Sequence, residues 1–181
     1  MHDPLDRQHT DIHLEHKGCV HDGHEVHKII ATIVGTTVGS VIVAPRPIHE
    51  PELTVDHPSL PMVYQLYVDS QMRRKGIGTI LMDAAENFAR SQGSNSIGLC
   101  VVPDNHAARQ LYAARGYKIL TKNEVISYWN VSSETGMCAE SVSTIPMRKD
   151  LGRSQARTNR PRERKASEAR TTPGPFLSRG G

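Results

Sequence analysis

The sequence predicts an α/β fold, and three observations lead to that prediction. Two stretches have the spacing of an amphipathic helix, several stretches rich in β-branched residues have the pattern of strands, and the two kinds alternate along the chain. The 181 residues are enough for one domain with a substantial core. We expect this domain to span residues 28–151, between a polar, histidine-rich N-terminal segment (1–27) and a basic, disordered tail (152–181).

The charge of the chain is unevenly distributed. The formal net charge is +3, but residues 148–181 carry +7 and the remainder carries −4. The basic tail has one aromatic residue, Phe176, so we expect a mobile, solubilising tail and no nucleic-acid partner. The three cysteines form no C-x-x-C pair, and we see neither a signal peptide nor a membrane span. These features indicate a cytoplasmic protein.

The expected strands lie on both sides of a proline-rich segment. Residues 28–33 and 36–44 predict a hairpin that turns at Val34-Gly35, and residues 11–16 form a possible short strand before it. Five prolines between residues 45 and 61 predict a loop, because proline removes backbone donors and disfavours helix. Further strands are expected at 62–68, 96–102, 117–120, 124–129 and 143–151.

Two helices are expected, each closed by a glycine. Residues 76–91 place apolar side chains at i, i+3, i+4 and i+7, and Gly93 follows as the stop signal. The second helix begins after Asp104 or Asn105, either of which is a good N-cap, and ends at Gly116.

The entry to the first helix has the features of an anion site. A strand, a short cationic loop and a helix follow one another, and the loop contains Gly76 and Gly78 behind three cations. The first amides of a helix lack intrahelical partners, and a loop without Cβ atoms lets a phosphate approach them closely. The P-loop and dinucleotide motifs do not fit, because Thr79-Ile80 and Leu81 occupy their diagnostic positions. Glycines that merely begin a helix are the alternative interpretation.

Two motifs together resemble the GNAT superfamily of N-acetyltransferases. The family's acyl-CoA signature, Q/R-x-x-G-x-G/A, matches Arg73-Arg74-Lys75-Gly76-Ile77-Gly78. Its second motif, N-x-x-A-x-x-L-Y-x-x-x-G-F/Y, matches "NHAARQLYAARGY" from Asn105 to Tyr117. The resemblance covers residues 28–151. It implies a mixed, mainly antiparallel sheet with helices on both faces, and an N-terminal region that is truncated here.

The resemblance also implies a function and a set of site residues. The function is direct acetyl transfer from acetyl-CoA to a primary amine, on a small molecule or a protein; a non-catalytic acyl-CoA-binding module of the same fold is the alternative. The pantetheine arm should pair with the strand edge at Leu66, Tyr67 and Val68. Tyr112 should act as general acid toward the departing thiolate, although a core aromatic is its other interpretation. Binding of the cofactor is further expected from the phosphate loop and the asparagine: Arg73, Arg74, Lys75, Gly76, Ile77, Gly78, Thr79 and Asn105.

The sequence departs from the family pattern in two ways. Members often have a carboxylate base at the positions of Cys100 and Met62, so the base here is a water chain or a loop residue such as Glu52, Asp56 or His57. The two helices that usually follow the first strand are also absent from the pattern. The acceptor site is therefore open, or completed by the 45–62 loop or by a second subunit in a homodimer.

The N-terminal histidines raise the question of a metal. Imidazole and thiolate suit zinc or nickel. Glycines at 18 and 23 argue against a shared helix face, so a solvated loop is favoured and no metal is expected. The residues concerned are His13, His16, Cys19, His21, His24 and His27.

Overall fold

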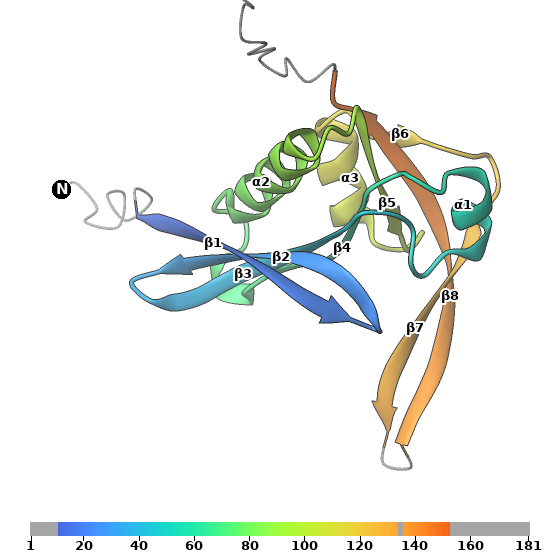
Figure 1. Ribbon diagram of the computed structural model, residues 1–181. Coiled ribbons are helices and arrows are strands. Elements are labelled where there is room, and N and C mark those ends of the chain that lie inside the picture. The colour runs from blue at the N-terminus through green and yellow to red at the C-terminus, as the bar shows by residue number, and fades with distance from the viewer. Residues whose placement is uncertain (1–10, 134–135, 153–181) are drawn as a thin grey trace, which may run out of the picture.

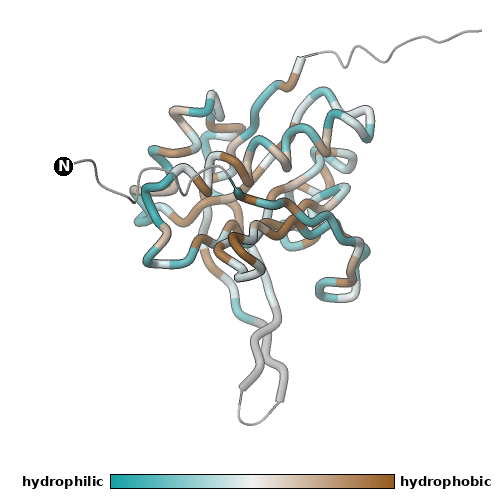
Figure 2. Tube along the Cα trace, turned by 90° about the vertical axis from the view of Figure 1, so that its left-hand side faces the viewer, coloured by the Kyte–Doolittle hydropathy of each residue, from teal (hydrophilic) through white to brown (hydrophobic). Residues whose placement is uncertain are grey.

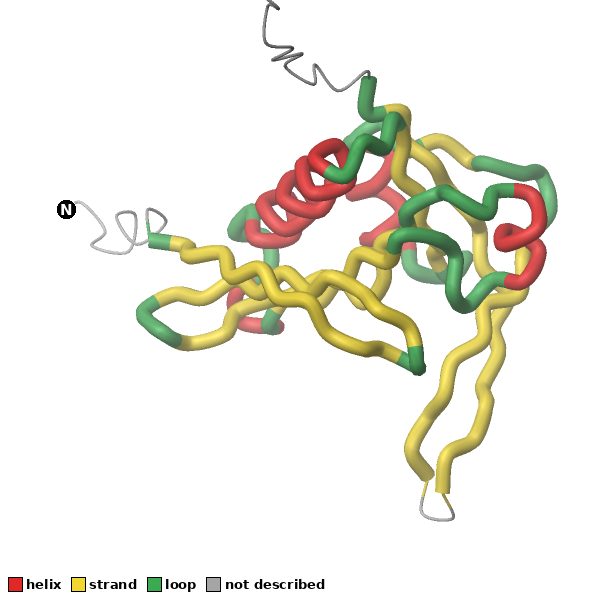
Figure 3. The backbone as a smooth tube through the Cα atoms, viewed as in Figure 1, coloured by secondary structure: helices red, strands yellow, loops and turns green. Residues whose placement is uncertain are grey.

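The computed structural model describes residues 11–133 and 136–152 of the chain, as an eight-stranded sheet with three α-helices (Figures 1 and 3). In chain order the elements are β1 (Ile12–His21), β2 (His24–Ile33), β3 (Thr36–Ala44), α1 (Pro51–Asp56), β4 (Met62–Val68), the short 3-10 helix η2 (Ser70–Met72), α2 (Ile77–Ser91), β5 (Ser96–Val101), α3 (His106–Ala114), β6 (Lys118–Ile119), β7 (Val125–Ser133) and β8 (Gly136–Asp150).

The sheet is mixed and mainly antiparallel, as expected. The strand order is β1-β2-β3-β4-β5-β8-β6, and β7 pairs with the first half of β8. Among the described strands only β4 and β5 run parallel, and their pairing is limited to Met62 with Gly98 and Val63 with Leu99. Beyond Val63 the two strands separate, while β4 stays paired with β3 as far as Val68. The sheet therefore opens between β4 and β5.

The helices cover both faces of the sheet. On one face, α2 and α3 pack on the larger core, to which they contribute Ile77, Leu81 and Tyr112. On the other face, Leu53 of α1 packs with Met62 of β4 and Val125 of β7. Figure 2 shows hydrophobic segments at the centre of the fold and hydrophilic ones toward its periphery. The prediction of helices on both faces is confirmed.

Three segments differ from the sequence-based expectations. The sheet begins at Ile12 rather than at residue 28, because β1 and β2 form a hairpin closed by Asp22 and Gly23, both with positive φ. The prediction that residues 45–61 are entirely loop is wrong: α1 begins at Pro51, the first helical position, where a missing N–H costs nothing. The last two strands are longer than expected and form the hairpin that projects away from the body in Figure 1.

No helix within the described residues combines the length and the apolar character needed to cross a bilayer. The expected tail beyond residue 152 lies outside the described residues.

Candidate functional site

The cationic loop leads directly into α2. Gly76 precedes the helix with a φ of 82°, in the left-handed region that favours glycine. The first intrahelical bond runs from the Ile80 amide to the Gly76 carbonyl, at 3.0 Å. The amides of residues 77–79 thus open the helix without intrahelical acceptors. Arg73, Arg74 and Lys75 are exposed around this helix start, which makes the loop a positively polarised N-terminus.

The strand before this loop presents an unpaired edge. Leu66, Tyr67 and Val68 lie in the part of β4 that has already separated from β5. Gln65 has a positive φ of 49°, and the register of β4 against β3 shifts at this point, so the strand carries a bulge. Along these residues the edge of β4 opposite β3 has no strand partner among the described residues.

Tyr112 of α3 reaches the opening between β4 and β5. Its side chain is 7% exposed and lines a cavity of about 300 Å³ together with Leu66 and Cys100. Burial raises the pKa of Tyr112 to about 12, so the hydroxyl keeps its proton at neutral pH. The ring also lies against Tyr117, with centroids 5.9 Å apart. The structure thus brings the expected acid and the β4 edge to one cavity.

Asn105 has the role of a helix cap. Its side-chain oxygen accepts a hydrogen bond from the Ala108 amide at 3.1 Å, and the residue is exposed. Neither Asn105 nor any residue of the loop 73–79 is among the residues that line the cavity. The structure therefore places the expected site residues in two regions, the cationic loop before α2 and the cavity that Tyr112 lines, with the β4 edge between them.

A buried carboxylate that sequence reasoning missed also lines this cavity. Glu50 is 1% exposed and is the residue immediately before α1. Its Oε2 accepts a hydrogen bond from the Tyr64 hydroxyl at 2.7 Å, and its Oε1 accepts one from Ser127 Oγ at 2.8 Å. Ser127 Oγ lies 2.9 Å from Thr144 Oγ1, so the carboxylate ends a chain of buried hydroxyls.

The carboxylate changes the assignment of the base. Of the loop residues considered from the sequence, Glu52 and Asp56 are exposed and none of the three lines the cavity. Cys100 does line it, but burial and then the charge of Glu50 raise the pKa of the thiol to about 12. A neutral thiol is a poor nucleophile and a poor base, which leaves Glu50, the one carboxylate among the residues that line the cavity, and the neighbouring His49 as proton acceptors there.

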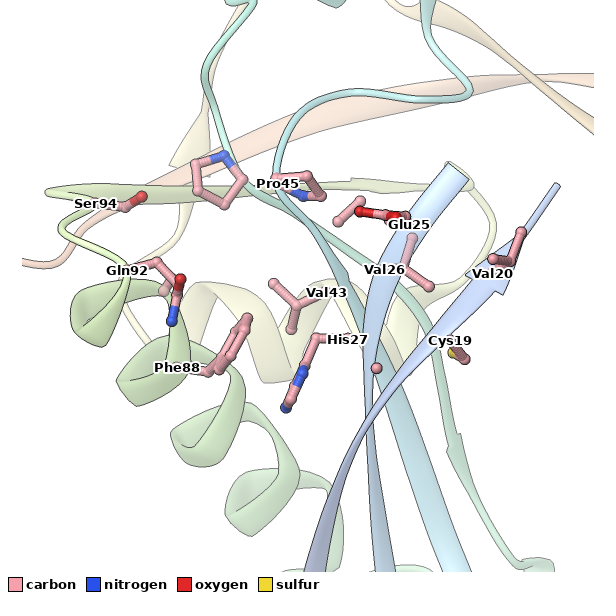
Figure 4. Close-up of a pocket in the computed structure, with 14 residues that line it drawn as sticks. Cys19, Val20, Glu25, Val26, His27, Val43, Pro45, Phe88, Gln92 and Ser94 are labelled. Atoms are coloured by element: carbon pink, nitrogen blue, oxygen red, sulfur yellow. The ribbon is translucent and has the colours of Figure 1, made fainter. Parts of the chain in front are cut away.

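A larger cavity of about 710 Å³ lies elsewhere, between the β1–β2 hairpin and the end of α2 (Figure 4). In that view the His27 ring faces Phe88, and the two rings stack with centroids 3.8 Å apart. The cavity is lined by none of the expected site residues. Its size alone does not make it the reaction site, since it holds neither the acid nor the carboxylate.

Comparison with curated proteins gives two relatives. The chain is 34% identical over 86 residues to the uncharacterised protein YxbD of Bacillus subtilis, a match that covers 46% of this chain and 53% of YxbD. It is 30% identical over 67 residues to an uncharacterised N-acetyltransferase of Methanocaldococcus jannaschii, covering 37% of this chain and 28% of that protein. The matches thus span about half or less of these relatives.

Solved structures share the fold. An IAA acetyltransferase from Bacillus cereus superposes with a TM-score of 0.51 at 15% identity, over 69% of this chain and 77% of that one. A GNAT family acetyltransferase from Elizabethkingia anophelis, crystallised with acetyl-CoA bound, gives 0.50 at 12% identity, over 69% and 76%. At these identities the similarity establishes the fold alone.

The family itself is established by sequence. A model described as the acetyltransferase (GNAT) family matches residues 2–117, well over half of the chain. This range contains the cationic loop, the edge of β4 and the helix that carries Tyr112, and it confirms the resemblance that the two motifs indicated. The chain belongs to the GNAT family of acetyltransferases.

Proposed function

We propose that the protein transfers an acetyl group from acetyl-CoA directly to a primary amine. The observation that carries this proposal is the meeting of Tyr112 and Glu50 in one cavity, at the point where β4 and β5 separate. A protonated phenol and a buried carboxylate are the acid and the base that such a transfer needs. Family membership and the polarised helix start support the choice of donor.

The donor is expected to bind along the β4 edge. The pyrophosphate sits on the amides of residues 77–79 and near the cations at 73–75, where a helix N-terminus favours an anion. The pantetheine arm then pairs with the free edge of Leu66, Tyr67 and Val68, in the position of an added strand. This arrangement brings the thioester to the cavity that Tyr112 lines.

In the proposed reaction the acetyl group leaves the sulfur of coenzyme A and becomes bonded to the amine nitrogen. The amine nitrogen attacks the thioester carbon, a tetrahedral oxyanion forms, and the C–S bond breaks as the carbonyl returns. Tyr112 donates its proton to the leaving thiolate and regains one from the nitrogen as the latter becomes an amide, and backbone amides of β4 stabilise the oxyanion. Amines enter mainly as ammonium ions, because their pKa is near that of lysine, so one proton must be removed before attack.

Glu50 is the proposed acceptor of that proton. The Tyr64 and Ser127 hydroxyls hold its two oxygens in place, and each oxygen keeps a further lone pair for the substrate or for a bridging water. The same negative charge attracts a cationic amine into the cavity. We therefore replace the loop residues Glu52, Asp56 and His57 with Glu50 as the proposed base.

The activity test uses the full chain. We expect free thiol to appear when the protein is incubated with acetyl-CoA and an amine from a panel of polyamines, aminoglycosides and peptides. Tyr112→Phe should lower kcat by roughly 10- to 1000-fold with little change in acetyl-CoA affinity. Tyr128→Phe, at an exposed tyrosine on β7, is the control and should keep full activity. Tight acetyl-CoA binding without thiol release from any amine would instead favour the acyl-CoA-binding module.

The donor site has its own test. Gly76→Asp should abolish acetyl-CoA binding in calorimetry, because it places a carboxylate where the pyrophosphate is expected. Gly93→Asp is a closely matched control: Gly93 follows the other end of α2, has a φ of 83° against 82° for Gly76, and likewise has open space around its missing Cβ. Both substitutions strain the backbone alike, so only the first should affect binding. Equal affinity in the two variants would contradict the placement of the pyrophosphate.

A further inference from the structure

The fold divides the N-terminal histidines between the two faces of the β1–β2 hairpin. His16 and His27 lie on the face toward α2, where His16 Nδ1 is 3.1 Å from His27 Nε2 and His27 stacks on Phe88. His21 lies at the tip of the hairpin, beside the turn at Asp22 and Gly23. The solvated loop favoured from the sequence is therefore wrong, since these histidines lie on the β1–β2 hairpin, and they do not form a single group.

The tip of the hairpin instead meets the segment that follows β3. His21, Asp22 and His49 each direct one metal-ligating atom to a common point, and these atoms lie within 4.8 Å of one another. The Asp22 Oδ2 atom is 3.7 Å from His49 Nε2 and 3.9 Å from His21 Nε2. All three side chains are largely buried, with exposed fractions of 22%, 19% and 10% for His21, Asp22 and His49.

These separations are too long for direct hydrogen bonds but close to the spacing of ligands around an ion. A hydrogen bond between such atoms spans about 2.7–3.2 Å. Two ligands of a tetrahedral zinc ion, each about 2.1 Å from the metal, are about 3.4 Å apart. A carboxylate held between two imidazoles at 3.7 and 3.9 Å therefore needs only a small contraction to close around a cation.

The chemistry of the three groups suits the same ion. Two imidazoles and one carboxylate form a mixed nitrogen and oxygen set that binds zinc well. Three protein ligands leave a fourth position for water or another group, and the ion would replace the hydrogen bond between Gln65 Nε2 and His21 Nε2, which are 3.2 Å apart.

We propose that His21, Asp22 and His49 form a binding site for a divalent zinc ion. The ion would join the hairpin tip to the segment that carries Glu50, the residue after His49. His49 and Gln65 both line the cavity that contains Tyr112 and Glu50, so the zinc site borders this cavity. A bound ion would fix the tip of the β1–β2 hairpin to His49 in the cavity wall. The tip itself is a two-residue turn, Asp22 and Gly23.

The first test is zinc binding by the full chain after treatment with a chelator. Calorimetry with zinc chloride should show one equivalent that Asp22→Asn weakens by at least tenfold. Asparagine tolerates the positive φ of 47° at this position, so the turn and the melting temperature of the zinc-free protein should be preserved. His49→Gln should give the same loss. Unchanged affinity in both variants would overturn the proposal.

Control variants separate this site from the other histidines. His13→Gln removes an exposed imidazole from the same strand and should leave the zinc equivalent intact. His16→Gln removes one member of the His16–His27 pair and should also leave it intact. Loss of the equivalent in His16→Gln but not in Asp22→Asn would move the ion to the imidazole pair and disprove the assignment.

A spectroscopic test identifies the ligands independently of activity. Cobalt(II) in place of zinc should give visible absorption bands whose position and intensity report a low-symmetry site with nitrogen and oxygen ligands. The bands should disappear in Asp22→Asn and persist in His13→Gln. Zinc should also raise the melting temperature of the parent more than that of Asp22→Asn, because the ion links two segments only when all three ligands are present. An equal rise in both proteins would count against the site.

Discussion

Two glutamates are almost completely buried in this protein, and their surroundings are opposite. Glu86 of α2 is 2% exposed and faces cations: its Oε1 is 2.9 Å from Arg115 Nη2, and its Oε2 is 2.7 Å from Lys149 Nζ. Glu50 is 1% exposed and accepts hydrogen bonds from the neutral hydroxyls of Tyr64 and Ser127. Within residues 11–133 and 136–152, Glu86 forms ion pairs and Glu50 forms none.

The difference separates a structural carboxylate from one available for chemistry. Glu86 joins α2 to the end of α3 and to β8, and its charge is neutralised within the fold. Glu50 is held in place by dipoles, which fix its geometry but leave its charge free to act on whatever enters the cavity. Burial is the same in both cases, so the partners rather than the exposure indicate function.

The largest expected effect is on catalysis. Glu50→Gln should lower kcat by about 100- to 10,000-fold, because the amide cannot accept a proton at neutral pH. Its effect on stability should be small, since an amide oxygen can still accept one of the two hydroxyl hydrogen bonds. The rate of thiol release measures the change in kcat, and urea unfolding measures the change in stability. Glu52→Gln, an exposed glutamate two residues away, is the control, and equal activity in the two variants would exclude Glu50 as the base.

The matching substitution at Glu86 should have the reverse pattern. Glu86→Gln leaves Arg115 and Lys149 without their shared partner, and we expect the free energy of unfolding to fall by about 3 kcal/mol. The kcat of the folded protein should stay unchanged. Urea unfolding curves with parallel activity assays test this. A loss of kcat as large as that of Glu50→Gln would erase the distinction between the two carboxylates.

A smaller effect is expected from the hydroxyls that hold Glu50. Ser127→Ala removes the hydrogen bond to Oε1, a bond to a charged group worth about 1.5–3 kcal/mol, and should lower kcat by about tenfold. Ser143→Ala on β8, whose hydroxyl donates to Glu124 at an exposed position, is the control. Steady-state kinetics should show the loss only in the first variant. An unchanged kcat in Ser127→Ala would mean that the orientation of Glu50 does not depend on this bond.

The smallest effect concerns Cys100. With its thiol pKa raised to about 12, only a trace of thiolate exists at neutral pH, so Cys100→Ala should change kcat by no more than about twofold. In a Cys19→Ser/Cys138→Ser background, alkylation by iodoacetamide should be slow at pH 7 and should accelerate as the pH rises toward 12. The raised pKa also stabilises the fold below the ordinary thiol pKa, and this contribution disappears as pH passes through 12. Rapid alkylation at pH 7 would reopen a covalent route through Cys100.

The donor half of the candidate site could be predicted from sequence because it is local. The loop, its two glycines and the first turn of the helix after it lie within residues 73–80, and the N-cap at Asn105 and the capping glycine at Gly116 frame the helix that carries Tyr112. Short-range backbone rules determine such features. The structure places both helices within a residue or two of their predicted bounds.

The acceptor half could not be predicted because it depends on contacts between distant segments. Glu50 is 77 residues from Ser127, and its surroundings are formed by two separate strands, β4 with Tyr64 and β7 with Ser127. Nothing in "RPIHEPEL" distinguishes the buried Glu50 from the exposed Glu52. One local sign was available: proline at position 51 is a favoured first residue of a helix, which would have predicted α1.

The separation of β4 from β5 has a consequence for the behaviour of the protein in solution. From Tyr64 onward β4 carries backbone groups without a strand partner on one side, and Tyr67 beside them is 51% exposed. Such an edge invites pairing with a strand of another molecule. Acetyl-CoA bound along this edge would block such pairing, so it would protect the folded protein from self-association as well as serve as the substrate. Protein saturated with coenzyme A should therefore aggregate less and melt at a higher temperature than ligand-free protein. The size of the effect should depend on the ratio of the coenzyme A concentration to its dissociation constant.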